Sequence, residues 1–399
     1  MAELYPYQKD AVRKLLSGRH IIVAQCGAGK TAIALKWAEN CPKKKLLVIT
    51  TASKAHTTDW QDEAKVFAPN MKLDSFEVVS WHMAKKWVNN KGYEEIGQYK
   101  VIFDEIQRAK QGVSSLMGKA FLTITRNTSD WIGATGTPGD KWIDFYAYFQ
   151  ATNRVRNKTM FKRQFCIEQR YPFPMILAYQ NEPQLKSWWS EISYTPDTSE
   201  VMSQLPSETH QVISLPTPKG YKKVLKTSTT LDGEFLDSNM ALLHELRQMC
   251  ATPAKLSALS DLLESLSSPL VLFYNYTVER TQILELAQKL GRKVWRIDGE
   301  KHEVPTAETI GNTDIVLCHY LSGSEALNLQ FCHYWLSYSY NWSYSTSLQA
   351  RGRIKRLGQK HPMFYYYLET EGTVEQTVKK ALKNKSDFAA ESWSPEMEE

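Results

Sequence analysis

The sequence predicts an α/β protein with two parallel sheets, each flanked by helices. In two separate regions of the 399-residue chain, short apolar runs typical of buried strands alternate with longer helical stretches. A chain of this length can form two domains of ordinary size, each with its own core. The apolar runs lie at 20–25, 45–50, 76–81, 100–105 and 131–136 in the first region and at 269–275, 293–298, 314–320, 334–339 and 363–368 in the second.

The stretch between the two regions has a different character. Aromatic and charged helical segments, such as 140–150 and 239–249, flank an extended segment with several prolines at 205–218. We expect helical protrusions from each lobe, joined by a connector near 205–218. The predicted organisation is a first lobe at 1–150, protrusions and connector at 151–265, a second lobe at 266–385 and an acidic tail at 386–399.

The composition is that of a folded, water-soluble protein, with 42% hydrophobic and 23% charged residues. The longest apolar runs are too short to span a bilayer, and the N-terminus lacks the apolar core of a signal peptide. The six cysteines form no C-x-x-C pair, which argues against a disulfide framework and a structural zinc site. We therefore expect a cytoplasmic location and no membrane partner. The net charge of +6 permits a polyanionic partner without requiring one.

A glycine-rich turn, AQCGAGKT at 24–31, lies between a predicted strand and a predicted helix. In this context backbone N–H groups and the helix N-terminus are aimed at phosphate. Glycines let the backbone wrap the β-phosphate, the lysine contacts the β and γ oxygens, and the threonine hydroxyl ligates Mg²⁺. The alternative is a chance G-K-T at a helix start. The sequence predicts a site for ATP and Mg²⁺ built from Gly27, Ala28, Gly29, Lys30 and Thr31.

Two adjacent carboxylates end the apolar run VIFDEIQ at 101–107. The carboxyl edge of a parallel sheet is where α/β proteins place their ligands. We expect Asp104 to hold Mg²⁺ through water, and Glu105 to orient and deprotonate the attacking water. The pair alone is a weak signal, but its position about seventy residues after a phosphate loop strengthens it.

These motifs resemble those of the superfamily-two helicases. The loop AQCGAGKT matches A-x-x-G-x-G-K-T, in which alanine commonly opens the loop. DEIQ at 104–107 resembles the D-E-x-H/Q motif, and GATGTP at 133–138 resembles the third motif. YPYQKDAV at 5–12 resembles the upstream segment whose glutamine, here Gln8, reads adenine. The resemblance implies two tandem RecA-like lobes with the nucleotide bound between them.

Other segments resemble one branch of that superfamily, the Swi/Snf-type remodeller ATPases. QARGRIKRLGQ at 349–359 matches Q-A-x-x-R-x-x-R-x-G-Q, and DEIQRAK at 104–110 also resembles this branch. So do LRQMCATPAKL at 246–256 and SGSEALNLQ at 322–330. The resemblance runs from about residue 4 to residue 376, which is nearly the whole chain.

The resemblance implies arginine fingers in the second lobe. By position these are Arg353 and Arg356, three residues apart on a helix predicted to follow the strand at 334–339, so we expect both on one helical face. Guanidinium groups suit the charge spread over a transferring phosphoryl group. The alternative is a solvated basic helix face. By the same resemblance, nucleotide state is coupled to lobe closure by Gln107, Thr135, Gly136, Thr137 and Gln349, although ordinary turn chemistry before Pro138 also accounts for the two threonines.

The resemblance also places nucleic-acid contacts in loops at the ends of both sheets. Hydroxyls, amides and backbone N–H groups there bind phosphate without reading sequence. For each residue a purely structural role is the alternative. The candidates are Thr51, Ser53, Lys54, Ser80 and Trp81 in the first lobe and Asn275, Ser322, Gly323, Asn328 and Trp342 in the second.

Three departures from the remodeller pattern concern the nucleic-acid side. Ser324 and Ala326 replace two glycines of A-G-G-x-G-L-N-L, and the D-x-x-W-N-P motif keeps only Trp342. The segment after 296–300 is short and lacks the arginine-rich helix of the family. The predicted catalytic residues are intact. The departures therefore leave open the polynucleotide preference and the coupling of hydrolysis to movement.

The resemblance implies an ATP-dependent DNA translocase or helicase that uses ATP and Mg²⁺ and acts in replication, recombination or repair. Duplex DNA is favoured over single-stranded DNA as its track. Two alternatives stay open: an RNA helicase of the same superfamily, and a nucleic-acid-binding scaffold without ATPase activity. The size of the chain favours a phage or mobile-element protein in the host bacterial cytoplasm, with a replication or recombination protein as partner.

Overall fold

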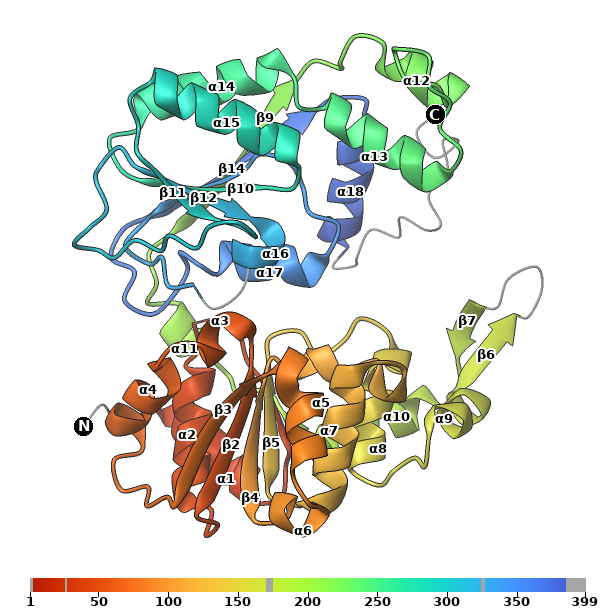
Figure 1. Cartoon of the computed structure of the whole chain (residues 1–399), viewed down its shortest axis with the longest axis vertical. Coiled ribbons are helices and arrows are strands. Elements are labelled where there is room, and N and C mark those ends of the chain that lie inside the picture. Colours follow the sequence, from red (N-terminus) through yellow and green to blue (C-terminus); the bar gives the residue numbers. More distant parts are fainter. Residues whose placement is uncertain (1–2, 26, 170–174, 324–326, 385–399) are drawn as a thin grey trace. The chain divides into compact units, whose positions relative to one another are not determined.

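The computed structural model describes residues 3–25, 27–169, 175–323 and 327–384. The chain forms two compact units, residues 1–200 and 201–399, called here the first and second unit. Each unit contains a parallel sheet with helices packed on it (Figure 1). The predicted α/β fold class is confirmed, and each predicted apolar run contains a strand.

In the described part of the first unit, six parallel strands pair in the order β3-β2-β4-β5-β1-β8. Helices α1, α2 and α4 lie on one face of this sheet, and α5 and α7 lie on the other (Figure 1). The strands are β1 (Ile21–Val23), β2 (Lys45–Thr50), β3 (Ser75–Ser80), β4 (Tyr99–Asp104), β5 (Trp131–Thr135) and β8 (Ser193–Tyr194). The helices are α1 (Pro6–Leu16), α2 (Lys30–Asn40), α3 (Ala52–Ala55), α4 (Asp59–Phe67), α5 (Trp81–Asn90), α6 (Tyr93–Ile96), α7 (Leu116–Asn127), α8 (Tyr146–Ala151), α9 (Lys158–Phe165) and α10 (Glu182–Ile192), with a small antiparallel pair β6 (Cys166–Gln169) and β7 (Met175–Tyr179).

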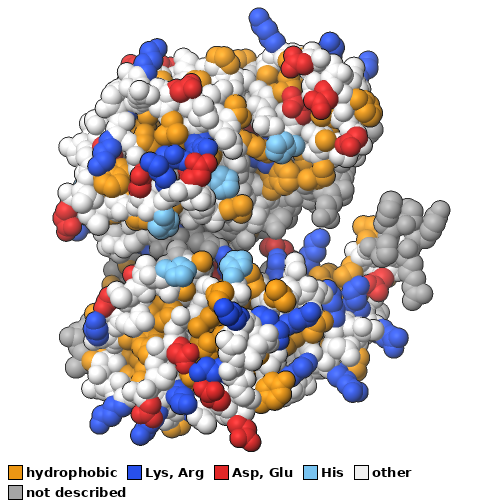
Figure 2. Space-filling model, viewed as in Figure 1, with side chains coloured by type: hydrophobic (Ala, Val, Ile, Leu, Met, Phe, Trp, Pro, Cys, Tyr) orange, Lys and Arg blue, Asp and Glu red, His pale blue; other side chains and the backbone are white. Residues whose placement is uncertain are grey.

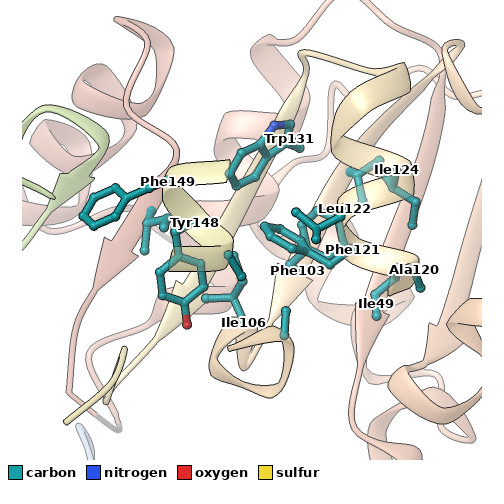
Figure 3. Close-up of a cluster of buried hydrophobic side chains, with 14 of the residues drawn as sticks. Ile49, Phe103, Ile106, Ala120, Phe121, Leu122, Ile124, Trp131, Tyr148 and Phe149 are labelled. Atoms are coloured by element: carbon teal, nitrogen blue, oxygen red, sulfur yellow. The ribbon is translucent and has the colours of Figure 1, made fainter. Parts of the chain in front are cut away.

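Strands buried on both faces explain why the runs in this unit are continuously apolar. All six residues of β4 are buried, and alternate residues face opposite helical layers. Figure 3 shows the layer formed by α7 and the strands, in which the rings of Phe103, Phe121 and Trp131 meet. The Phe103 and Phe121 ring centroids are 5.0 Å apart, and the ring planes are nearly perpendicular, an arrangement that aromatic pairs prefer. This packing holds β4 and β5 in place against α7.

The second unit repeats the plan. Its described strands pair in the order β11-β12-β10-β13-β14-β9, all parallel. Helices α14 and α15 cover one face, and α16 and α17 lie on the other (Figure 1). The strands are β9 (Glu208–Leu215), β10 (Leu270–Tyr274), β11 (Val294–Ile297), β12 (Ile315–His319), β13 (Tyr334–Ser337) and β14 (Met363–Thr370). The helices are α12 (Tyr221–Thr227), α13 (Asn239–Met249), α14 (Pro253–Ser265), α15 (Thr277–Lys289), α16 (Tyr320–Gly323), α17 (Tyr344–Arg351) and α18 (Val374–Lys383), and α11 (Ser199–Met202) lies at the boundary of the units.

The stretch predicted as protrusions and connector is divided between the two units. Helices α9 and α10 contribute Phe161, Phe165 and Leu185 to the core of the first unit, whereas α12 and α13 pack in the second. The connector predicted at 205–218 differs from the structure, because residues 208–215 form the edge strand β9 beside β14. Prolines flank this strand on both sides and cannot donate to a sheet, so they confine it to eight residues. The acidic tail predicted at 386–399 lies outside the described residues.

Among the described helices, none combines the length and the apolar character that a membrane span requires. The described cysteines are all free thiols in buried positions: Cys41, Cys166, Cys250, Cys318 and Cys332. No disulfide therefore constrains the described part of either unit, and the fold depends on packing and hydrogen bonding.

A buried ion pair joins two helices of the second unit. The Lys255 ammonium on α14 lies 2.6 Å from the Glu375 carboxylate on α18, and the side chains are 0% and 1% exposed. The same carboxylate accepts a hydrogen bond from the Thr370 backbone N–H at 2.9 Å. Because both charges are out of water, each depends on the other for compensation.

We predict that Lys255→Met destabilises the second unit by about 3–5 kcal/mol, because it leaves the Glu375 carboxylate buried without its cation. The double variant Lys255→Met/Glu375→Gln should recover most of this loss, since the amide is neutral and keeps an acceptor for the Thr370 N–H. Urea denaturation followed by far-ultraviolet circular dichroism measures both. Equal losses in the single and double variants would contradict the assignment.

Candidate nucleotide site and nucleic-acid interface

The loop between β1 and α2 has the backbone that its glycines allow. Gly27 and Gly29 have φ angles of +86° and +73°, in the left-handed region that favours glycine. A Cβ atom on Gly29 would lie 2.3 Å from the Gln8 amide nitrogen, so a larger residue would displace the Gln8 amide. Gly29 is the N-cap of α2, which begins at Lys30 and directs its first N–H groups toward the loop. This is the local geometry of a phosphate site.

Helix α1 is fastened to the loop. The Gln8 amide nitrogen donates to the Ala28 carbonyl at 3.2 Å, and the Tyr7 hydroxyl donates to the same oxygen at 2.9 Å. The Gln8 amide oxygen accepts from the Tyr5 backbone N–H at 2.9 Å, and the residue is only 5% exposed. The structure thus places Gln8 beside the loop, and its contact with adenine stays a prediction. Sequence reasoning missed Tyr7, whose only signal was its position next to Gln8.

Strand register brings the three motifs of the first unit to one level. Ala134 of β5 pairs with Ile22 on one side and with Asp104 on the other. The Ala24 N–H donates to the Thr135 carbonyl at 2.9 Å, which extends this pairing into the loop. The loop, the acid pair and the 133–138 turn therefore lie at the carboxyl edge of one sheet.

Lys30 and the 133–138 turn lie side by side. The Lys30 ammonium donates to the carbonyls of Ala24 at 2.9 Å and Gln25 at 3.1 Å. A Cβ atom on Gly136 would lie 3.9 Å from the same ammonium. The Thr135 hydroxyl accepts from the Thr137 N–H at 3.0 Å, which is the turn chemistry that was the alternative for these residues. Among the described residues the buried Thr137 hydroxyl has no hydrogen-bond partner.

Asp104 ends β4 and is 4% exposed. Its Oδ2 atom accepts from the Thr50 hydroxyl at 2.8 Å and lies 3.1 Å from the Lys54 ammonium. Burial opposes the charged form, but Lys54 and Thr50 outweigh it and hold the pKa of the Asp104 carboxyl below its ordinary value. The carboxylate is therefore ionised at neutral pH, as a ligand of a divalent cation must be.

Glu105 has an uncommon backbone. Its φ and ψ are both 52°, a left-handed conformation that costs a residue other than glycine about 1–3 kcal/mol. The Gln107 amide donates to the Glu105 carboxylate at 2.6 Å, and the indole of Trp81 donates to the Asp104 carbonyl at 2.7 Å. Hydrogen bonds on both sides therefore support the strained turn. Strain of this kind is typical of functional sites.

The oxygen atoms of Asp104 and Thr31 suit Mg²⁺ that is shared with substrate phosphates, rather than a metal ion held by protein ligands alone. No group of three or more His, Cys, Asp or Glu residues within the described ranges could hold a metal ion. Mg²⁺ usually keeps several waters and takes one or two protein oxygens together with substrate phosphates. The buried, ionised Asp104 at the carboxyl edge of the sheet and Thr31 in the first turn of α2 supply such oxygens.

The two predicted arginine fingers do not share a helical face, which corrects the sequence prediction. Helix α17 ends at Arg351 with Gly352 as its C-cap, so Arg353 and Arg356 lie in the turns that follow. Arg353 is 3% exposed and donates from Nη1 to the Leu327 carbonyl at 3.1 Å. Arg356 is half-buried, and its Nε donates to the Gly352 carbonyl at 3.3 Å. The two arginines therefore have different surroundings within the second unit.

The predicted nucleic-acid residues of the first unit lie together at the ends of β2 and β3. Thr50 pairs with Ser80 across these strands, so Thr51 is beside Ser80. Thr51 and Ser80 are buried, and Ser80 caps α5 through the Met83 N–H. For Ser53 only the backbone, within α3, is described.

Trp81 is a core residue, which corrects its prediction as a contact. It is 1% exposed, its ring stacks on Phe103 at a centroid distance of 5.7 Å, and its indole N–H is bonded to Asp104. The Lys54 ammonium is paired with Asp104, and its contact with nucleic acid stays a prediction. Sequence reasoning missed this pair, because no spacing rule links Lys54 to a carboxylate fifty positions later.

In the second unit, several predicted contacts are occupied by internal bonds. The Asn275 amide nitrogen donates to the Ser339 hydroxyl at 2.8 Å and to two nearby backbone carbonyls, and its oxygen accepts from Asn341 at 2.9 Å. The Arg247 guanidinium lies over the ring of Trp342, 4.9 Å from its centroid. A Cβ atom on Gly323 would lie 2.5 Å from Cys318.

Other predicted residues of this unit remain accessible. Ser322 and Gln349 are half-buried, and Asn328 is exposed. The substitutions noted at Ser324 and Ala326 lie outside the described residues.

Comparisons with known proteins agree with the motifs. A family model described as "Type III restriction enzyme, res subunit" matches residues 1–127. DNA repair and recombination protein RAD54B of Mus musculus is 30% identical over 115 residues, covering 27% of this chain and 13% of that protein. SWI/SNF-related matrix-associated actin-dependent regulator of chromatin subfamily A-like protein 1 of Xenopus laevis is 22% identical over 435 residues, covering 96% of this chain and 43% of that protein.

A solved structure, the Sulfolobus solfataricus SWI2/SNF2 ATPase core in complex with dsDNA, is similar over 98% of this chain and 94% of that chain, at 17% identity and a TM-score of 0.44. The chain spans less than half the length of either relative named above. The sequence matches make the chain similar to these helicase-like proteins, and the loop, acid-pair and arginine motifs lie along the chain in the order that the resemblance predicts.

Proposed function

We propose that this chain is an ATP-dependent DNA translocase or helicase, which hydrolyses ATP to move along or remodel DNA. The observation that carries the proposal is the meeting of three motifs at one sheet edge. Lys30 follows the loop glycines, Gly136 lies against Lys30, and Asp104 is in register with the strand that precedes Gly136. An ATPase needs phosphate binding, a metal ligand and a base in one place.

The residues divide the chemistry between them. The loop N–H groups and Lys30 would bind the phosphates of ATP, and Glu105 would orient the attacking water and accept its proton. Asp104 and Thr31 would hold Mg²⁺, which when bound neutralises charge on the transferring phosphoryl group. Gln107 donates to Glu105 and therefore positions the base. Arg356 is proposed as the residue that stabilises the transition state from the second unit.

DNA is proposed as the track, with duplex DNA favoured over single strands. Support comes from the relative named for DNA repair and recombination and from the Swi/Snf-type motifs at 246–256 and 349–359. In Figure 2, Lys and Arg side chains are spread over the visible face of the first unit among acidic and hydrophobic side chains, and the net charge of +6 permits a polyanionic partner. A replication or recombination protein is the proposed partner, and the free thiols support the proposed cytoplasmic location.

We predict that duplex DNA raises the ATPase rate at least tenfold. An effect of this size corresponds to an ordinary coupling free energy between two ligand sites. The test compares steady-state ATPase rates with duplex DNA, single-stranded DNA, RNA and no polynucleotide, alongside displacement of a third strand from a DNA triplex. Stimulation by RNA alone would establish the RNA-helicase alternative. No ATPase activity under any condition would establish the scaffold alternative.

We predict that Glu105→Gln lowers the ATPase rate by about 10²–10⁴-fold, the range for loss of a general base. Binding of a fluorescent ATP analogue should be unchanged, because Asp104, Lys30 and the loop are untouched. Glu94→Gln, at an exposed position on α6 of the same unit, is the matched control and should be silent. A Glu105→Gln rate near that of the parent protein would rule out Glu105 as the base.

We predict that Arg356→Ala lowers the ATPase rate by about 10³-fold with a much smaller loss of ATP binding, because an arginine finger acts chiefly on the transition state. Lys355→Ala removes the neighbouring charge, which is paired with Glu208 at 3.0 Å, and serves as the control. Equal losses of hydrolysis and binding would instead assign Arg356 a structural role.

A further inference from the structure

We propose that Lys54 couples the nucleic-acid surface of the first unit to the metal-holding carboxylate of Asp104. In the absence of nucleic acid the Lys54 ammonium pairs with Asp104, and a bound phosphate backbone draws it away. The Asp104 carboxylate, no longer paired with a competing cation, would then be available to hold Mg²⁺. The inference rests on the proposed function, because it assumes that this chain binds both MgATP and DNA.

The first observation is the geometry of one carboxylate oxygen. Oδ2 of Asp104 receives both the Thr50 hydroxyl, at 2.8 Å, and the Lys54 ammonium, at 3.1 Å. Thr50 is neutral and belongs to β2, so it fixes the carboxylate without opposing a cation. Lys54 brings a full positive charge to the same oxygen. Two cations close to one carboxylate repel each other, so the ammonium and Mg²⁺ disfavour each other's binding.

The second observation is the unequal exposure of the two partners. The Lys54 side chain is 24% exposed, whereas the Asp104 side chain is 5% exposed. A polyanion approaching this edge therefore meets the Lys54 side chain before it meets the Asp104 carboxylate. The four-carbon stem of lysine lets the charge move without moving the backbone, which suits a group that serves two anions in turn.

The third observation is where Lys54 lies in the fold. It lies on α3, a four-residue helix that follows β2 at the carboxyl edge of the sheet. Thr51, at the N-cap of this helix, and Ser80, at the end of β3, are predicted phosphate contacts. Lys54 thus stands between the predicted nucleic-acid loops and the nucleotide site, and among the described lysines it is the one that forms an ion pair with Asp104.

The charges around Lys54 favour the paired state when no polyanion is present. Burial lowers the pKa of the Lys54 ammonium, but the carboxylates of Asp104, Glu105 and Glu63 outweigh burial, so the pKa is raised. The ring of Trp60 lies 5.7 Å from the ammonium and adds a weaker attraction. Lys54 therefore stays protonated at neutral pH, and an added anion changes its position rather than its charge.

The test measures metal-dependent nucleotide binding, not turnover. The full chain is titrated with Mg²⁺ in the presence of a fluorescent, slowly hydrolysed ATP analogue, with and without duplex DNA. For the parent protein, DNA should lower the half-saturating Mg²⁺ concentration by about fivefold or more, the lower end of ordinary coupling between sites. Lys54→Met should show the lowered value already without DNA and should respond no further when DNA is added.

Two variants serve as controls. Lys54→Arg keeps the charge and should retain a DNA-dependent shift. Lys65→Met removes an exposed lysine of α4 that is paired with Asp62 at 2.7 Å, and it should behave as the parent protein does. If Lys54→Met does not fold, as judged by circular dichroism, Lys54→Gln replaces it, because the amide can still donate to Asp104 without carrying charge.

Three results would overturn the inference. In Lys54→Met without DNA, the half-saturating Mg²⁺ concentration is unchanged, or it rises, as a residue that merely positions Asp104 would require. Alternatively, it falls but DNA still lowers it as far as in the parent protein. Failure of the proposed function is a separate result, because it is read from the ATPase rate of the parent protein with DNA. If DNA stimulates the ATPase of the parent protein but Lys54→Met gives the same Mg²⁺ titration as the parent, only the inference about Lys54 is rejected.

Discussion

The candidate site depends on one constraint, the parallel register of β1, β5 and β4. Ala134 is aligned with Ile22 and with Asp104, so three chain segments that are far apart in sequence leave the sheet at the same level. A shift of one residue in β4 would turn Asp104 to the opposite face of the sheet. The aromatic packing of Phe103 against Phe121 and Trp131 opposes such a shift, because Phe103 immediately precedes Asp104. Core packing and site geometry are therefore parts of one arrangement.

The same packing supports the strained turn at Glu105. The left-handed backbone of this residue is unfavourable on its own, and the structure surrounds it with compensating contacts. Ile106, directly after the turn, is fully buried and lies so close to Gly133 that a Cβ atom there would be 2.2 Å from it. The Trp81 indole N–H donates to the carbonyl of Asp104, the residue before Glu105. The burial of Trp81, which removes it from the predicted nucleic-acid surface, thus gives it a role in positioning the turn at Glu105.

The sequence predicted the features that depend on local chemistry. Glycines at 27 and 29, a lysine at the helix start and two carboxylates at the end of an apolar strand carry their own physical reasons, and the structure places them together. The sequence did not predict the surroundings of single side chains. Whether Trp81 faces solvent or core depends on which helix covers β4, and the end of α17 at Arg351 depends on tertiary contacts of the turn that follows. Neither is contained in a pattern of neighbouring residues.

The second sheet applies the same edge geometry to a different purpose. At its carboxyl edge Asn275 joins the end of β10 to the segment after β13, and Arg247 packs its guanidinium against Trp342. Arg353 likewise spends a hydrogen bond on the Leu327 carbonyl. These contacts use polar groups that a free binding surface would leave exposed, so they connect segments within the second unit. The first unit thus brings its two carboxylates to the sheet edge, whereas in the described part of the second unit these polar groups bond within the unit, and Arg356 bonds to the Gly352 carbonyl.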